Sequence, residues 1–216
     1  MSIMSVNPEF DESMQFGPVG SHTLRLQTKY PVIAASRLRL RPFALSDIPR
    51  LVTAVAAHRI ADATLAVPRP FDARWARQWI ESHPLEWRKR CAIHWAVSGL
   101  DNDWLAGYVG LHDIQLDRGR ANVSFWIAER TSRKDLAIEA AQAALAFAFT
   151  SLPVDAVQAH QLSGNPLVAR ILRRLGMKPD TVVPRAVSGW DRSEEALAWS
   201  VSKTSWMGSL QDTAAH

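Results

Sequence analysis

Basic residues lie between a strand pattern and a long helix pattern near the middle of the chain. A strand is predicted over 122–127, where β-branched and aromatic residues dominate, and a helix over 136–149, which is rich in alanine and leucine. The elbow between them holds Arg130, Arg133 and Lys134. A helix N-terminus presents unpaired backbone N–H groups and the positive end of the helix dipole. The junction is therefore predicted to bind an anion, with the basic side chains adding to its charge.

The same elbow also fits a helix that satisfies its own first amides. Ser132 and Asp135 have the spacing of a capping box, with Ser132 as the N-cap and Asp135 as the third helical residue. A carboxylate there competes with phosphate for the N–H donors. At about 5 Å and an effective dielectric near 20, the repulsion is about 3 kcal/mol before screening. An anion site and a self-capped helix start both remain open.

The hydropathy pattern predicts the strands and helices that position this junction. Strands are predicted over 37–42, 92–98, 104–114, 122–127, 154–160, 182–183 and 197–201. Besides the helix over 136–149, helices are predicted after Ser46, after Asp72 as N-cap, and over 165–175 with Gly176 as C-cap. Pro84 is expected to kink or end the second of these helices.

The two ends of the chain lack sustained periodicity. Residues 1–35 are interpreted as an irregular arm with a short strand at 23–27, and residues 204–216 as a frayed tail. With 216 residues and 47% hydrophobic content, the chain is long enough for one well-buried core. One domain between the arm and the tail is the expected organisation.

Composition restricts the classes of function. The net charge is +4 and the arginines are spread along the chain, so nucleic-acid binding is not demanded and an acidic small ligand fits equally well. The single Cys91 excludes an internal disulfide and suits a reducing cytoplasm. No apolar run is long enough for a membrane span. The sequence contains no zinc-ligand spacing or P-loop, and a metal is not implied.

The strand–elbow–helix unit resembles motif A of the GNAT superfamily of acyl-CoA-dependent N-acyltransferases. That motif runs Arg/Gln-x-x-Gly-x-Gly/Ala; Arg130 holds its first position, and Arg133 and Asp135 stand at its glycine positions. Glu139-Ala140 matches a common Glu-Ala pair of the family. Further segments resemble the RimJ/RimL type, which acetylates ribosomal-protein N-termini: 36–42 with Asp47, 61–71 with Ala76 and 79–80, and Asn165 with 175–177. The resemblance spans roughly residues 37–202.

The resemblance implies an α/β fold with a defined layout. It predicts a mixed, mostly antiparallel twisted sheet of six to seven strands flanked by about four helices. The acetyltransferase domain would comprise residues 36–203, between an arm of residues 1–35 and a tail of residues 204–216. A homodimer in the cytoplasm is expected by the same analogy.

The resemblance also implies how acetyl-CoA would bind. The N–H groups of Ile127 and Ala128 would hold the pantetheine and the thioester carbonyl where two strands splay apart. The elbow amides and Asn165 would hold the pyrophosphate and the pantetheine, and Arg170 or Arg174 would reach phosphate. The implied cofactor-binding residues are Ile127, Ala128, Arg130, Arg133, Lys134, Asp135, Leu136, Ala137, Asn165 and Arg170.

Acyl transfer from a thioester requires a proton to leave the amine and another to reach the thiolate. Relatives carry a glutamate at the position of Asn122, which cannot take a proton. His112 and Asp113 on the preceding strand are the nearest titratable candidates, although a strand-end hydrogen-bonded pair is the alternative interpretation. Tyr108 is a candidate donor to the thiolate, or a buried strand tyrosine.

Other chemically capable residues have a structural interpretation. His94 lies in an apolar run and is interpreted as a core histidine with satisfied hydrogen bonds, and His160 fits either role. Cys91 borders a strand and is interpreted as a buried, inert thiol. Ser124 stands where relatives have glycine and is interpreted as filling space.

Three hypotheses follow for the function. The first is an N-acetyltransferase that moves an acetyl group from acetyl-CoA to a primary amine by direct attack in a ternary complex, the amine being a protein N-terminus, an amino acid or a small amine. The second is a protein of the same fold that has lost this chemistry and binds a ligand or a partner. The third is an enzyme that uses another acyl donor.

Overall fold

A single mixed sheet forms the centre of the computed structural model, which describes residues 29–57, 71–100, 103–128, 134–162, 166–186 and 193–214. Its eight strands lie in the order β1-β2-β3-β4-β5-β6-β8-β7. Their bounds are β1 Ile33–Ala34, β2 Leu38–Arg41, β3 Ile93–Gly99, β4 Leu105–Gln115, β5 Arg120–Ile127, β6 Ala156–Leu162, β7 Lys178–Ala186 and β8 Ser193–Ser202. β5 and β6 pair in parallel and every other neighbouring pair is antiparallel.

Five α-helices and one 3-10 turn accompany the sheet in the described part of the chain. They are η1 Leu45–Asp47, α1 Ile48–Ala57, α3 Ala73–Arg88, α4 Lys134–Ser151, α5 Pro166–Arg174 and α6 Lys203–Ala214. The parallel step from β5 to β6 needs a crossover, and α4 supplies it. The mixed α/β architecture predicted from the sequence is confirmed, with β1 and α6 in addition to the expected elements.

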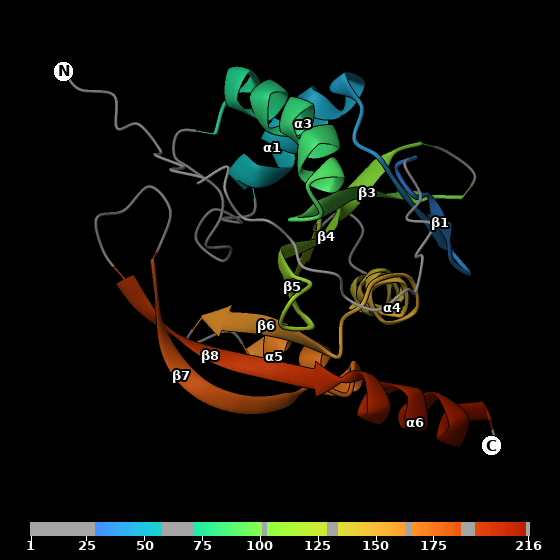
Figure 1. Ribbon diagram of the computed structural model, residues 1–216. Helices are drawn as coiled ribbons and strands as arrows, with labels where there is room; N and C mark the ends of the chain where they lie inside the picture. The colour runs from blue at the N-terminus through green and yellow to red at the C-terminus, as the bar shows by residue number, and fades with distance from the viewer. Residues whose placement is uncertain are drawn as a thin grey trace, which may run out of the picture.

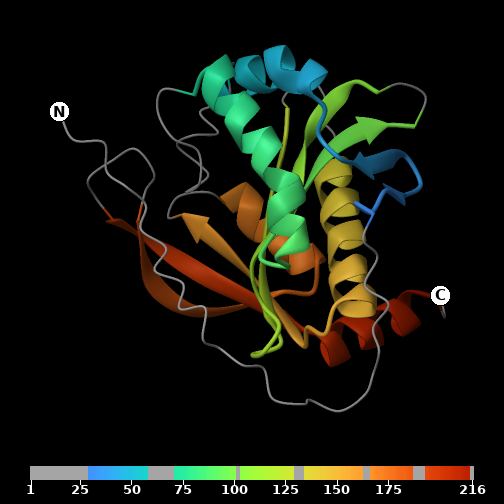
Figure 2. The same cartoon turned by 45° about the horizontal axis from the view of Figure 1, so that its top comes forward.

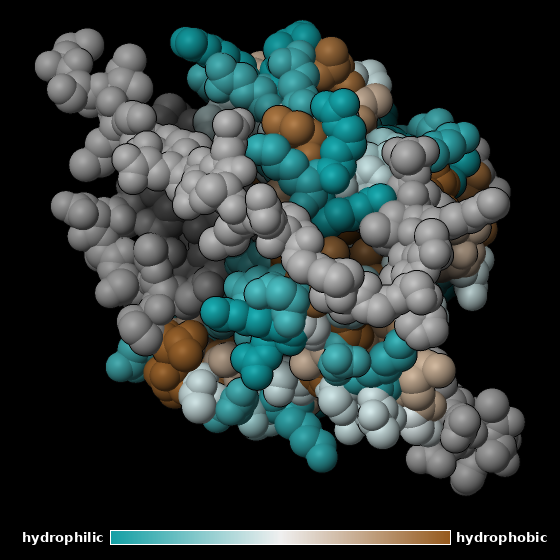
Figure 3. Space-filling view, viewed as in Figure 1, coloured by the Kyte–Doolittle hydropathy of each residue, from teal (hydrophilic) through white to brown (hydrophobic). Residues whose placement is uncertain are grey.

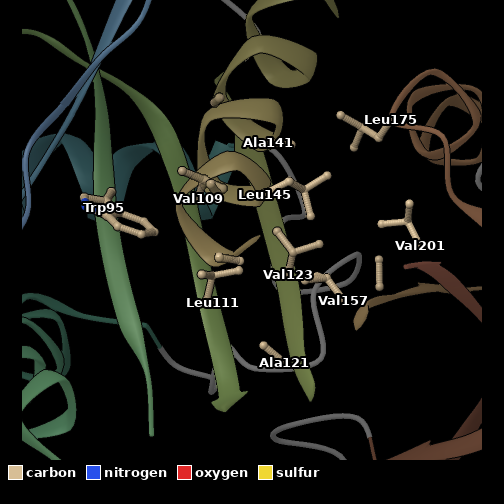
Figure 4. Packing of buried hydrophobic residues seen from close by; sticks show 14 of the residues in the cluster. Trp95, Val109, Leu111, Ala121, Val123, Ala141, Leu145, Val157, Leu175 and Val201 are labelled. Atoms are coloured by element: carbon tan, nitrogen blue, oxygen red, sulfur yellow. The ribbon is translucent and has the colours of Figure 1, made fainter. Parts of the chain in front are cut away.

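The helices cover the sheet in two groups. α1 and α3 pack side by side, as Figures 1 and 2 show, and only the C-terminal end of α3 reaches α4, where Trp87 lies near Phe147. α4 has five fully or nearly fully buried alanines, which let its backbone approach the strands closely; they are Ala137, Ala140, Ala141, Ala144 and Ala148. Figure 4 shows this core, in which the helix residues Ala141 and Leu145 pack with the strand residues Trp95, Val109, Leu111 and Val123.

A second and smaller core lies under α1 and α3. It combines aliphatic side chains with aromatic ones, among them Phe43, Tyr108, Trp79 and Trp126. The outer surface of α3 is hydrophilic over most of its length (Figure 3), with Arg74, Arg77, Gln78 and Glu81 exposed. One side of the sheet is therefore covered by an alanine-rich helix and the other by an aromatic layer.

The chain preceding β2 is tied to the sheet instead of forming the loose arm predicted up to residue 35. The Tyr30 hydroxyl donates to the His94 carbonyl at 2.6 Å and accepts from the His94 N–H at 2.8 Å. The Trp95 indole N–H donates to the Pro31 carbonyl at 2.9 Å. The prediction is thus wrong over residues 30–35, and the strand expected at 23–27 lies outside the described residues.

Two other stretches are more regular than predicted. α3 starts as predicted, because the Asp72 carboxylate accepts from the Trp75 N–H at 2.8 Å, but it continues through Pro84 to Arg88. The residues expected to form a frayed tail form α6, where Trp206 is buried and packs against Phe149. In both places tertiary packing outweighs a local signal for irregular structure: α3 buries Ile80, His83 and Trp87 on one face, and α6 is anchored by Trp206.

Candidate functional site

The far end of β5 presents backbone groups that no described strand pairs with. β5 and β6 are in register from Arg120–Ala156 only as far as Asn122–Gln158, yet both strands continue beyond these residues. The two strands therefore splay apart after Asn122. This is the geometry that the sequence resemblance implied for a bound thioester.

The alternation of an antiparallel ladder decides which groups face the splay. The Ala128 N–H donates to the Ala106 carbonyl of β4 at 2.9 Å, so the Ala128–Ala106 pair is hydrogen-bonded. The adjacent pair, Ile127–Gly107, is then a non-hydrogen-bonded pair, and the N–H and C=O of Ile127 point away from β4. The same holds for Phe125. The N–H of Ile127 therefore points toward the splay, and its role in binding stays a prediction, whereas the N–H of Ala128 is already occupied by the Ala106 carbonyl.

α4 is the next described element after β5, so its N-terminus follows the splayed end of that strand. The helix begins at Lys134, so the N–H groups of residues 134–136 have no partner within it. Leu136 packs partly against the core and Ala137 is buried, which anchors the first turn. Arg130, Arg133 and Asn165, also predicted to bind the cofactor, lie outside the described residues, as does the side chain of Lys134.

Asp135, one half of the predicted capping box, lies in the first turn of α4. It is the second helical residue and not the third, and its side chain is 61% exposed. Its charged partner within the described part of the chain is Arg174 of α5, whose Nη1 lies 3.9 Å from the Asp135 Oδ1. The Ser132 half of the box lies outside the described residues. Arg174 offsets part of the negative charge that Asp135 brings to the helix start, and Arg170 lies exposed one turn earlier on α5.

The proton-transfer candidates His112 and Asp113 form a small cluster with Asn122 at the opposite end of β5. The Asp113 carboxylate is 3.1 Å from the His112 Nδ1 and accepts from the Asn122 amide at 2.9 Å. Asp113 has a φ of 48° and a side chain that is 57% exposed. Asn122 precedes Ile127 by five residues, or about 16 Å of extended strand. This geometry matches the strand-end pair, the alternative interpretation of these residues.

A second polar cluster, which the sequence did not single out, extends from α3 across the sheet to β5. The Ser82 hydroxyl and the His94 Nε2 both contact the Glu86 carboxylate, at 2.7 and 2.8 Å. The His94 Nδ1 lies 3.0 Å from the Tyr108 hydroxyl, which lies 3.3 Å from the Ser124 hydroxyl. We call Glu86, His94, Tyr108 and Ser124 the relay cluster. His94 is a core histidine with satisfied hydrogen bonds, as predicted, but its partners connect it to the splay.

Burial shifts the pKa values of several groups in and around the relay cluster. The hydrogen bond from His94 lowers the pKa of Glu86 to about 2, and burial raises the pKa of Tyr108 to about 12. Burial also lowers the pKa of His83 to about 3, and the neighbouring His94 lowers it further. His83 Nε2 is buried without a hydrogen-bond partner among the described residues. Glu86 is thus a carboxylate at neutral pH, while Tyr108 and His83 are uncharged.

The remaining candidates have structural surroundings. Glu139 binds the Arg37 backbone N–H and Nε, both at 2.7 Å, and so ties α4 to the start of β2. Cys91 is exposed, not buried as predicted, and the pKa of its thiol is raised by burial and by Glu86. Neither residue lies at the splay. The signals that could have located the relay cluster were Ser82 and Glu86 four residues apart on a helix and the small residues Gly110 and Ser124 on the strands facing His94.

The arrangement of splayed strands and a following helix defines a known class of fold. The family description "Acetyltransferase (GNAT) domain" matches residues 37–178 of the chain. The protein therefore belongs to the GNAT acetyltransferase family. No protein matches in a search of the curated proteins.

Solved structures agree with this assignment at low sequence identity. RimJ of Mycobacterium smegmatis, in complex with CoA-disulfide, is 13% identical with a TM-score of 0.70, covering 82% of this chain and 93% of its own. RimL, the ribosomal L7/L12 alpha-N-protein acetyltransferase, in complex with coenzyme A, is 14% identical with a TM-score of 0.70, covering 80% and 98%. Spermidine N-acetyltransferase of Vibrio cholerae is 16% identical with a TM-score of 0.66, covering 79% and 98%. At these identities the likeness establishes the fold.

Two features were looked for in the part of the chain that the structure describes, a membrane-spanning helix and a metal site. Within that part, no helix is both long and apolar enough to cross a membrane. The same residues include no group of three or more His, Cys, Asp or Glu side chains arranged to hold a metal ion.

Proposed function

We propose that this protein transfers an acyl group, acetyl in the first instance, from acyl-CoA to a primary amine by direct attack in a ternary complex. The observation that carries the proposal is the end of β5: its outward N–H and C=O groups face a splay, and the unpaired amides of α4 follow a few residues later. Family membership supports the same reaction class.

The proposed roles follow from the directions of these groups. The Ile127 N–H donates to the pantetheine or to the thioester carbonyl, which stabilises the negative charge that develops on that oxygen. The first-turn amides of α4 hold the pyrophosphate, assisted by Arg174 and Arg170 of α5. Asp135 opposes this binding, and the affinity for coenzyme A is therefore set by a balance of nearby charges.

The amine is proposed to approach from the side of the sheet that α1 and α3 cover. A row of aromatic rings runs there from the start of α3 toward β5: Phe71, Trp75, Trp79, Tyr108 and Trp126. Trp75 and Trp126 are partly exposed. Such a wall suits the apolar or cationic part of an amine acceptor. Protein N-termini, amino acids and small amines all remain candidates, and a homodimer remains a prediction.

Calorimetric titration with acetyl-CoA tests the proposal. We expect micromolar binding by the folded protein, followed by release of free thiol when a suitable amine is added. Ile127→Pro removes the N–H that faces the splay and is expected to weaken binding about three- to tenfold. Ile127→Ala keeps that N–H and serves as the matched control. A folded protein that gives no binding heat contradicts the proposal and leaves the scaffold to a ligand-binding or partner-binding role.

A further inference from the structure

The four residues of the relay cluster come from four different elements and form one continuous line. Glu86 lies on α3, His94 on β3, Tyr108 on β4 and Ser124 on β5. The contacts along the line are 2.8, 3.0 and 3.3 Å. One end, Glu86, has a side chain that is 30% exposed, and the other end, Ser124, lies two residues past the last paired position of β5 and β6. The line thus connects solvent beside α3 to the splay.

A glycine makes this line continuous. Gly110 pairs with His94 on one side and with Ser124 on the other, so it occupies the sheet position between them. The Tyr108 ring lies back over Gly110, and a β-carbon at Gly110 would come within 2.3 Å of the Tyr108 hydroxyl. Because residue 110 has no side chain, the phenol oxygen fills its place and bridges the histidine and the serine.

The ionised carboxylate fixes the direction of every hydrogen bond in the line. Glu86 can only accept, so the His94 Nε2 carries the proton that it receives, and the His94 Nδ1 is then an acceptor. The Tyr108 hydroxyl donates to that Nδ1 and accepts from the Ser124 hydroxyl. The donors all point toward Glu86, and the Ser124 oxygen is left able to accept a proton from the splay. The 3.3 Å contact is long, as contacts in unliganded sites often are.

We propose that the relay cluster takes the proton of the attacking amine and returns it to the departing thiolate, in place of a carboxylate on β5. The proposal rests on the proposed acyl transfer. As the amine nitrogen bonds to the thioester carbon, its proton moves to Ser124, that of Ser124 to Tyr108, and that of Tyr108 to the His94 Nδ1. When the C–S bond breaks, sulfur takes the electron pair and the line returns one proton to it. An amide and free coenzyme A thiol result, and the cluster is restored.

A carboxylate lies beside the His94 ring, where the relayed proton arrives. Glu86 supplies a negative charge at 2.8 Å. His83, also on α3, has its ring centroid 4.5 Å from that of His94 and stays neutral because burial depresses its pKa. Tyr108 faces the ring from β4, Tyr30 binds only the His94 backbone, and the exposed Cys91 lies near Glu86.

The test removes single hydroxyls and measures kcat and acetyl-CoA affinity separately. Tyr108→Phe keeps the ring and is expected to lower kcat about 100-fold, the usual size of a lost proton transfer, with an unchanged Kd for acetyl-CoA. Ser124→Ala is expected to show the same loss, and Ser124→Thr, which keeps the hydroxyl, is expected to restore most of kcat. Tyr30→Phe is the matched control, because it removes a phenol that binds only the His94 backbone, and should change kcat less than about threefold.

The pH dependence separates a relay from a structural role. His94→Gln is expected to lower kcat about as much as Tyr108→Phe and to change the pH profile of kcat/KM, whereas a residue with only a structural role would leave the shape of that profile unchanged. Folding of each variant is checked by circular dichroism, and if Ser124→Ala does not fold, Tyr108→Phe alone decides. Wild-type rates in Tyr108→Phe with acetyl-CoA bound would overturn the relay while leaving acyl transfer intact. Absence of acetyl-CoA binding in the wild type would overturn both.

Discussion

The two ends of β5 carry two polar clusters that differ in what they can do. At the start of the strand, His112, Asp113 and Asn122 bond to one another, and their carboxylate is more than half exposed. Toward the other end, His94 and Tyr108 of the relay cluster are buried, and the cluster leads to the part of β5 that no longer pairs with β6. A histidine beside a carboxylate is present in both. The comparison teaches that burial and a continuous path to an unpaired backbone, more than residue type, mark the site.

The largest expected effect comes from closing the space that holds Tyr108. Gly110→Ala places a methyl group 2.3 Å from the present position of the Tyr108 hydroxyl and 3.0 Å from the Ile93 carbonyl. The ring must move, so we expect kcat/KM to fall about 100-fold or more and the free energy of unfolding to drop by about 1–3 kcal/mol. Steady-state kinetics and urea unfolding measure the two effects.

Gly208→Ala provides the control for that glycine substitution. No atom lies within 4 Å of a β-carbon at Gly208 in α6, so stability should stay the same or rise by up to about 1 kcal/mol, and activity should be unchanged. A fully active Gly110→Ala enzyme would show that the position of Tyr108 does not matter, and the contrast between the two clusters would disappear.

A smaller effect is expected in the pH dependence of stability. The pKa of His83 is lowered to about 3 in the folded protein, so the unfolded chain binds its proton first. Stability from this group is complete above the unfolded pKa of about 6.5, is lost between there and about pH 3, and falls by about 2 kcal/mol by pH 5. His83→Phe should remove this slope, since the buried Nε2 has no partner among the described residues.

Urea unfolding at about pH 7.5 and pH 5 measures that slope. His112→Gln is the control, because it replaces a histidine of the exposed cluster and leaves the buried His83 in place. It should show the same slope of stability with pH as the wild type. If His83→Phe loses as much stability on acidification as the wild type, His83 is not held neutral by its burial.

A third expected effect concerns α4, the helix that follows the splayed end of β5. Asp135 is exposed and close to Arg174, so its charge acts through solvent and is worth about 1 kcal/mol or less. Asp135→Asn is therefore expected to tighten coenzyme A binding about three- to fivefold at low salt, and to have little effect at high salt. Calorimetry at two ionic strengths measures this.

Asp117→Asn is the matched control, because Asp117 is an exposed acid in the turn before β5, at the end of that strand away from α4. It should leave the affinity for coenzyme A unchanged. Weaker binding by Asp135→Asn would mean that the carboxylate assists the cofactor and does not repel it.

The smallest effect is expected at the start of β5, where the strand is still paired with β6. His112→Gln removes a titratable group, but its ring contacts an exposed carboxylate about 16 Å of strand from Ile127. We expect kcat to change less than about twofold and stability by about 0.5 kcal/mol or less. A loss of kcat as large as that of Tyr108→Phe would make the exposed cluster the base and reverse the comparison.

Much of the architecture could be predicted from local pattern. Three segments were predicted correctly: the alternating strand around Leu38 and Leu40, the helix capped by Asp72 and the alanine-rich helix over 136–149. The periods of strands and helices can be recognised within one segment, without knowledge of its partners. The irregular ends were predicted wrongly, since Tyr30 and Trp206 are held by partners far away in the sequence.

The sequence by itself determined the order of elements, the helix start after β5 and the resemblance to the GNAT family. Only the tertiary structure decided which backbone groups face the splay and which histidine reaches it. Glu86, His94, Tyr108 and Ser124 are separated by 8, 14 and 16 residues along the chain, and no periodicity joins them. Their contact arises because neighbouring strands place residues from distant segments directly opposite one another, and because Gly110 leaves room for the tyrosine between them.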